Sequence, residues 1–191
     1  MPQPIRDKLT TLRFERDAVV QSEKLAAHFL CAVNEWSRTE GTLGVLLGQI
    51  LNVRYAVATE ILGAVVNFTA RLDVVRAAAK ARLEQVRSEE TCALMDQARR
   101  RAGERNDLAH GIWGVSSDYP ARLLRCPPDK AFSIVNRHYE VGMTPREVLD
   151  ELKPHLELWD DKSFDEVQRR FRTLQEAIIT LSNRIGTERG A

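Results

Sequence analysis

The chain has 191 residues, with 28 Lys and Arg against 27 Asp and Glu, so its formal net charge is +1 at pH 7. A hydrophobic fraction of 43% and a charged fraction of 29% are typical of a globular protein and exclude a disordered chain. The near-neutral balance excludes a histone-like, wholly basic nucleic-acid binder, although it leaves room for a local basic patch. At this length one domain spanning residues 1–191 is expected, with a core that needs no disulfide or metal.

The three cysteines, Cys31, Cys92 and Cys126, are odd in number and widely spaced. They fit neither a disulfide framework nor a paired metal motif, and we interpret them as buried free thiols in a reducing compartment. Charged side chains interrupt the first twenty residues, where a signal peptide would need an apolar stretch. The longest uncharged run, between Glu40 and Arg54, is shorter than the roughly 20 residues that cross a bilayer. We therefore expect a cytoplasmic protein with no membrane partner.

Most of the chain has a helical pattern, because apolar residues recur every three or four positions. The predicted helices cover residues 7–34, 35–50, 53–66, 67–86 and 88–110. Asn67 is the expected N-cap of the fourth, since its side chain can accept from backbone N–H groups of the first turn. Ser88, followed by two acidic residues, is expected to begin the fifth. Gly111 suits the position just after the end of that helix.

The pattern changes after Trp113, where prolines exclude a long helix. Two short β-like runs, 123–126 and 132–135, flank a turn and predict a small hairpin. Helix returns at Thr144, which precedes Pro and a Glu placed for a capping box. A second such box at Ser163 is expected to begin the last helix. The apolar seam of that helix consists of Val167, Phe171, Leu174, Ile178, Leu181 and Ile185.

These elements predict an all-α, up-and-down helical bundle with a small β-like hairpin insertion before the last helices. Residues 114–143 form this irregular insertion, which is too apolar to be a solvated linker. The seam of the last helix must be buried against other helices or in a dimer interface.

Common catalytic motifs are missing from the sequence. The glycines lack the Lys-Ser/Thr ending of a phosphate-binding loop, and there is no Gly-x-Ser-x-Gly nucleophile elbow. The four histidines have no spacing that would place two zinc ligands on one helical face. We therefore expect no metal site and no cofactor.

One stretch, residues 104–113, stands apart at the end of a predicted helix. Asn106 and His110 are four positions apart and so are neighbours on one helical face. Arg105 is five positions before His110, about 140° away around a helix with 3.6 residues per turn.

Arg105-Asn106, three further residues and then His110 resemble the signature of the HEPN superfamily. In that signature an Arg, four to six residues and then a His lie on a helix of a bundle, often with a polar residue after the Arg. The resemblance covers the helical architecture of most of the chain and about six residues as a motif. It implies a metal-independent endoribonuclease acting as a homodimer, with the motifs of two protomers lining one cleft. It also implies a toxin–antitoxin or phage-defence setting, with a neutralising protein on a separate chain.

The chemistry of these three residues is consistent with RNA cleavage. His110 can take a proton from a ribose 2′-hydroxyl or give one to the leaving oxygen. Arg105 can hold the phosphate with two hydrogen bonds and offset charge that develops in the transition state. Asn106 can orient His110 or the phosphate. The angle of about 140° between Arg105 and His110 makes it difficult for both side chains of one helix to act on the same phosphate. The difficulty is smaller if each cleft combines Arg105 of one chain with His110 of the other.

A structural role for the same residues is the alternative, in a non-catalytic bundle that binds protein or nucleic acid. Arg105 falls on the apolar side of its helix, where a buried guanidinium must be paired. The acids that could pair with it from other helices are Glu35, Glu40, Glu60 and Asp73. His110 would then satisfy the last free carbonyls of its helix. The two hypotheses are separated by whether His110 is accessible to solvent and within reach of an Arg105 from either chain.

A basic run precedes the motif. Arg99, Arg100 and Arg101 could bind an RNA backbone, since phosphate contacts supply most nonspecific affinity. The alternative is a solvated helix face, which is the more common role of such a run.

Overall fold

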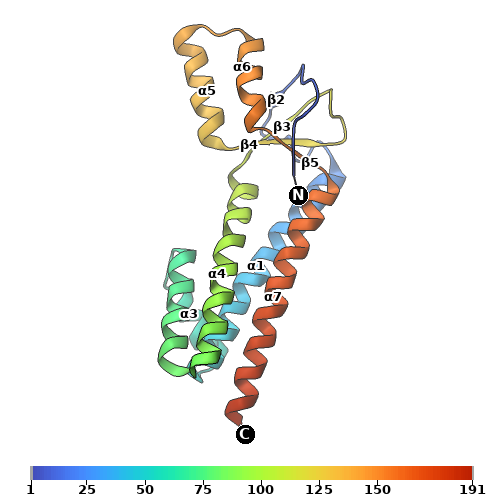
Figure 1. The fold of residues 1–191 in the computed structure, drawn as a ribbon. Coiled ribbons are helices and arrows are strands. Elements are labelled where there is room, and N and C mark those ends of the chain that lie inside the picture. Colours follow the sequence, from blue (N-terminus) through green and yellow to red (C-terminus); the bar gives the residue numbers. More distant parts are fainter. Residues whose placement is uncertain (1, 191) are drawn as a thin grey trace. The chain divides into compact units, whose positions relative to one another are not determined.

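The structure is a computed structural model that describes residues 2–190, with side chains described for residues 2–188. The helices are α1 (Glu23–Leu51), α2 (Tyr55–Gly63), α3 (Phe68–Arg82), α4 (Gln85–His110), α5 (Pro128–Val141), α6 (Pro145–Leu152) and α7 (Asp161–Gly190), with a short 3-10 turn η1 (Lys153–His155). The strands are β1 (Gln3–Pro4), β2 (Arg13–Phe14), β3 (Ile112–Val115), β4 (Leu123–Cys126) and β5 (Glu157–Trp159). The predicted fold class is confirmed, because the described chain is mostly helical with one small antiparallel sheet (Figure 1).

The chain divides into two compact units. Residues up to Val33 together with Asn106–Val167 form the sheet unit, and Asn34–Arg105 together with the residues from Gln168 on form the helical unit. Each unit therefore draws on two separate stretches of chain. The predicted insertion 114–143 belongs to the sheet unit.

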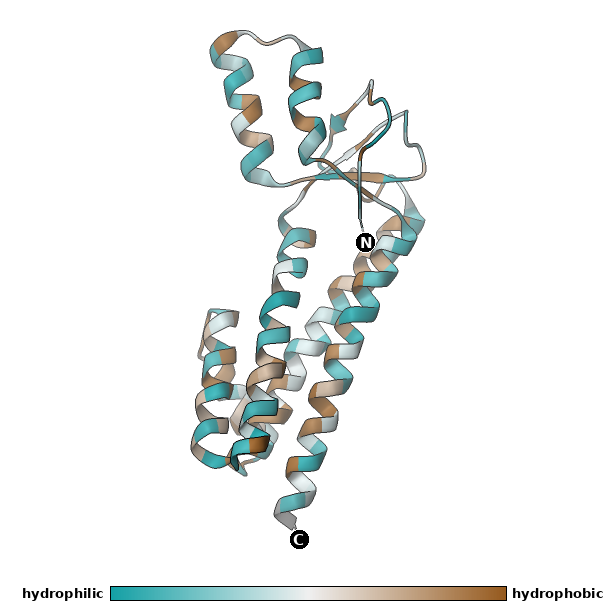
Figure 2. Ribbon diagram, in the orientation of Figure 1, coloured by the Kyte–Doolittle hydropathy of each residue, from teal (hydrophilic) through white to brown (hydrophobic). Residues whose placement is uncertain are grey.

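The helical unit contains α2, α3 and most of α1, α4 and α7. Its core is a continuous cluster of apolar side chains, among them Leu46, Leu72, Met95 and Ile178, each fully buried. The seam predicted for the last helix is confirmed, since its six residues are at most 3% exposed. Hydrophobic and hydrophilic residues alternate along α7 as this seam requires (Figure 2).

Two local signals explain where helices of this unit begin and meet. Asn67 caps α3 as predicted, accepting hydrogen bonds from the backbone N–H groups of Thr69 and Ala70. Gly44 lets α2 approach α1 closely, because a Cβ there would lie 2.9 Å from the hydroxyl of Thr59 and 3.1 Å from the ring of Tyr55. A larger side chain would force the two helices apart.

The described strands of the sheet unit form one antiparallel sheet in the order β1-β5-β4-β3-β2. Along β4, side chains alternate between two faces. Leu124 and Cys126 join a buried cluster with residues of α5 and α6, including Ile134 and Leu149. The opposite face carries an aromatic cluster made of Phe29, Trp113, Trp159 and Phe164, whose adjacent rings have centroids 5.0 to 6.1 Å apart.

The predicted helix over residues 7–34 is wrong in its first half, because α1 begins only at Glu23. Residues 10 and 11 are held in a non-helical conformation by Asp118, whose carboxylate accepts from the backbone N–H groups of Thr10 (2.7 Å) and Thr11 (3.0 Å). The segments expected at 7–34 and 35–50 are also not separate, since α1 runs unbroken to Leu51. A tertiary contact therefore overrides the local helical pattern.

The predicted hairpin is wrong in its second strand. Residues 132–135 lie within α5, where Pro128 in the first turn favours a helix and Ala131 and Ile134 bury one face. The first strand, β4, pairs with β3 and β5 instead. Thr144 forms the predicted capping box with Glu147. The start predicted for the last helix at Ser163 is two residues late, because α7 begins at Asp161 and Ser163 donates to the Asp160 carboxylate. Similarly, α4 begins at Gln85 and not at Ser88.

Asp118 gives this region a pH-dependent stability. The Thr10 hydroxyl and the backbone N–H groups of Thr10 and Thr11 lower its pKa from 3.8 to about 2. Because the pKa is lower in the folded state, the stabilisation is complete above about pH 4 and is lost as the pH falls through about 2.

We therefore expect Asp118→Asn to lower the free energy of unfolding at pH 7 and to flatten its dependence on pH between 4 and 2. Urea unfolding followed by circular dichroism across this range measures both effects. The control is Glu140→Gln, which removes an exposed carboxylate of α5 and should leave the slope intact. An equal slope for Asp118→Asn and wild type would contradict this account.

No single described helix has both the length and the apolar character that a bilayer crossing requires. Helices α1 and α2 meet these criteria only when they are taken together, across a bend of 118°.

Candidate active site

The three predicted catalytic residues lie on α4. Arg105 is half-buried, whereas Asn106 and His110 are exposed. The helix ends at His110, as predicted, and β3 begins two residues later at Ile112. Asn106 and His110 belong to the sheet unit and Arg105 is the last residue of its stretch of the helical unit.

Other residues satisfy two of the carbonyls at the end of α4. The Asp107 carbonyl accepts from the backbone N–H of Gly111 at 3.1 Å and from the Arg125 guanidinium at 3.2 Å. The Leu108 carbonyl accepts from the indole N–H of Trp113 at 3.2 Å. The imidazole of His110 forms no hydrogen bond or ion pair with any residue that the structure describes. Capping, the structural role considered for this side chain, is therefore performed by its neighbours.

Arg125 ties the last turn of α4 to the sheet. It lies on β4 between Trp113 of β3 and Glu157 of β5, which are its direct cross-strand partners. Although its side chain is only 5% exposed, its charge is paired with the carboxylates of Glu157 at 3.0 Å and Asp107 at 3.2 Å. Such pairing offsets the cost of burying a guanidinium. Arg125 thus fixes the end of the helix that carries His110.

Gly111 is required by this arrangement. A Cβ at this position would lie 2.7 to 2.8 Å from the side chain of Arg125 and 2.8 Å from the carbonyl oxygen of Asp107. The second contact is with backbone, so it cannot be relieved by moving a flexible side chain. Both the end of α4 and the placement of Arg125 depend on a glycine here.

Three of the four acids considered as partners of Arg105 have other contacts. Asp73 pairs with Arg99 at 2.9 Å, and Glu35 pairs with Arg172 at 3.3 Å. Glu40 accepts from the indole N–H of Trp36 at 2.6 Å.

The arginine run is partly neutralised. Arg99 pairs with Asp73, and Arg101 pairs with Glu104 at 2.5 Å. Arg100 is exposed and makes no ion pair with a described residue. The side chain best placed for an RNA backbone is therefore Arg100, and contacts from Arg99 and Arg101 would compete with their acids.

A hollow of about 300 Å³ adjoins the residue that follows His110. It is lined by Phe14, Glu15, Arg16, Val19, Gly111, Ile112 and Trp113. Arg16 is exposed and makes no ion pair with a described residue. An aromatic ring, a cation and a carboxylate thus border a space that reaches Gly111, the residue after His110.

Comparison of the chain with protein-family models, with curated proteins and with solved structures finds no match. The resemblance to the HEPN signature therefore remains a prediction from Arg105, Asn106 and His110.

The cysteines and potential metal ligands offer no second centre among the described residues. No three His, Cys, Asp or Glu side chains there are grouped to hold one metal ion. The interpretation of all cysteines as buried is wrong, since Cys31 is exposed and Cys92 half-buried. Cys126 is buried, and this burial raises its pKa to about 11, so the thiol stays protonated and is a poor nucleophile.

Sequence reasoning missed Arg125 as a residue of this site. The available signal was that Arg125 is a charged residue inside the otherwise apolar run 123–126. If this run is a buried strand, the charge of Arg125 must be paired with an acid. Phe14 and Arg16 could not be connected with His110, because nothing local indicates that the N-terminal segment lies beside β3.

Proposed function

We propose that the protein is a HEPN-type, metal-independent endoribonuclease that acts as a homodimer. The observation that carries this proposal is the state of His110. Its imidazole is exposed and unbonded to described residues, at a helix end where the carbonyls of Asp107 and Leu108 are already satisfied and whose position is fixed by Arg125. A side chain kept for structure alone would be expected to take part in that capping.

The proposed reaction is transfer of the phosphoryl group within the RNA chain. The 2′-hydroxyl oxygen attacks the adjacent phosphorus, the bond from phosphorus to the 5′ oxygen breaks, and the products are a 2′,3′-cyclic phosphate and a 5′-hydroxyl. One proton leaves the 2′ oxygen and one reaches the 5′ oxygen, and His110 carries one of these transfers. Arg105, from the second protomer, holds the phosphate, and Asn106 orients the imidazole or the phosphate.

The hollow beside Gly111 is the proposed place for a base next to the cleaved phosphate. Single-stranded RNA is commonly recognised by stacking of bases on aromatic rings and by polar contacts to their edges. Phe14 supplies such a ring, and Arg16 and Glu15 supply a donor and an acceptor. Arg100 is the proposed backbone contact on α4. The resemblance to the HEPN signature also carries the proposal of a toxin or defence role, with a neutralising protein on a separate chain.

The test is an assay of purified protein on a set of labelled single-stranded RNAs in excess EDTA. We expect cleavage with 2′,3′-cyclic phosphate ends, and we expect an RNA with one 2′-deoxy nucleotide at the cleaved position to resist, because it lacks the attacking hydroxyl. Intact RNA both in EDTA and in added divalent cations would refute the proposal. Binding of RNA without cleavage would instead support the non-catalytic alternative.

A further inference from the structure

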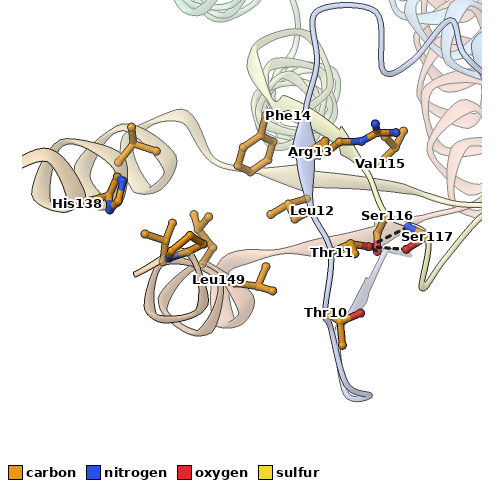
Figure 3. A pocket seen from close by; sticks show the side chains of 14 residues that line it. Thr10, Thr11, Leu12, Arg13, Phe14, Val115, Ser116, Ser117, His138 and Leu149 are labelled. Atoms are coloured by element: carbon orange, nitrogen blue, oxygen red, sulfur yellow. Dashed lines mark hydrogen bonds between the residues drawn. The ribbon is translucent and has the colours of Figure 1, made fainter. Parts of the chain in front are cut away.

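A cavity of about 680 Å³ lies between β2, α5 and α6 of the sheet unit (Figure 3). Its hydroxyl groups are bonded to one another, since Thr11 Oγ1 lies 3.0 Å from the hydroxyl of Ser116 and 2.8 Å from that of Ser117. Arg13 extends to the other side of β2 and pairs with Glu15 at 3.3 Å. The described lining of this cavity therefore does little to select one class of ligand. An apolar surface flanked by charges that have no partner among the described residues is found instead on helix α2 of the helical unit.

Helix α2 is apolar on its outer side as well as on the side that faces the core. Ala58 and Leu62 are buried, whereas Val57 is 40% and Ile61 38% exposed, and Tyr55 at the first position is 52% exposed. A surface helix usually carries charged and polar residues on the side that faces solvent. Exposed apolar side chains that gather on one element are typical of an interaction site.

Two opposite charges flank the outer side of α2. Arg54 directly precedes the helix and Glu60 lies in its second turn, and they are the only charged residues in the sequence between Glu40 and Arg71. Both are exposed, and neither makes an ion pair with a described residue. Each is three positions from Val57, so both are its neighbours on the same side of the helix.

This surface is complementary to itself. In an interface with two-fold symmetry, residue i of one copy contacts residue j of the other, and j contacts i. If two copies of α2 pack antiparallel with Val57 of each at the centre, Arg54 of each copy lies at the level of the partner's Glu60. Two pairs of opposite charge then border an apolar centre formed by Val57 and Ile61. We propose that the outer face of α2, made of Arg54, Val57, Glu60 and Ile61, joins two copies of this chain in an antiparallel helix pair.

A lipid surface fits the same helix less well than a second copy does. Helices that lie on a membrane usually carry several Lys or Arg residues beside their apolar side, which attract anionic headgroups. Helix α2 has one flanking cation, Arg54, and its single internal charge is the acid Glu60. An equal number of acids and bases is what a contact between identical surfaces requires.

The proposed ribonuclease acts as a homodimer, and α2 would be the surface that joins its two copies. This role rests on the proposed function, whereas association itself is measured without RNA. A protein that dimerises through α2 but leaves RNA intact would refute the reaction alone. A dimer that persists in the variants described below would refute the α2 contact alone.

The test is charge reversal, followed by analytical ultracentrifugation of the full-length protein at several concentrations. Arg54→Glu and Glu60→Arg each place like charges at the same level of the helix pair, so each should weaken the dimer by at least about tenfold. Both variants should stay folded, because the helix dipole favours an acid before the first turn and a base toward the last. Circular dichroism checks the fold. The matched control is Lys80→Glu, which reverses an exposed charge of α3 and should leave the dimer unchanged.

An equimolar mixture of Arg54→Glu and Glu60→Arg should form the dimer again, because one chain then carries two acids and the other two bases. The double variant, with both charges reversed in one chain, should dimerise as well. Only a contact between two copies of α2 predicts this restoration. Val57→Asp, at the centre, should abolish the dimer in every combination. A monomeric wild type, a dimer in either single reversal, or a mixture that stays monomeric would overturn the proposal, as would a monomer that binds vesicles of phosphatidylcholine and phosphatidylglycerol through α2.

Discussion

Replacing His110 with glutamine should reduce the rate of RNA cleavage by at least about 100-fold, because general acid–base catalysis usually contributes a factor of this size or more. Glutamine keeps hydrogen-bonding capacity but cannot exchange a proton near neutral pH. The residue is exposed and bonds to no described residue, so its replacement removes no structural contact. The measurement is the single-turnover rate in EDTA, together with the melting temperature, which should stay within a few degrees of wild type.

The matched control is His155→Gln, which changes a histidine of the same unit outside α4 and should leave the rate unchanged. Full activity of His110→Gln would show that this imidazole carries no proton in the reaction. A large fall in melting temperature would instead favour the structural role.

Replacing Arg125 with methionine should have the second large effect, this time on stability. Methionine keeps most of the length of the side chain and removes the charge that pairs with Glu157 and Asp107. Breaking a fully buried pair costs about 3–5 kcal/mol, and we expect about 2 kcal/mol here because the two acids remain partly exposed. Urea unfolding at pH 7 measures the loss.

Arg125→Met should also slow RNA cleavage under conditions where the variant is fully folded, because the last turn of α4 loses its link to β4 and β5. The control is Arg137→Met, which removes an exposed ion pair with Glu151 and should cost less than about 1 kcal/mol. Equal stability of Arg125→Met and wild type would show that the buried guanidinium is not what fixes the helix end.

The elements that sequence predicts well are those determined by neighbours in the chain. The Asn67 cap, the Thr144 capping box and the end of α4 before Gly111 all depend on groups within a few residues of each other. The seam of α7 follows from its periodicity alone. These features need no knowledge of tertiary contacts.

The elements that sequence predicts poorly depend on distant partners. Thr10 is held by Asp118, which is 108 positions away, and this contact excludes the helix that local periodicity favours. The three predicted site residues lie on one helix that the sequence pattern predicts, and the structure places them on that helix, α4. The role of Arg125 was not predictable, because it depends on a strand order that places Glu157 beside it.

The N-terminal segment supplies both outer strands of the sheet, β1 beside β5 and β2 beside β3. Each of these strands has only two residues, and β1 ends in a proline, which has no N–H to offer a further strand. The segment therefore shields the longer inner strands from pairing with other chains. Its removal would leave β3 and β5 with open hydrogen-bonding edges, and self-association and poor solubility would follow even if α4 stayed intact.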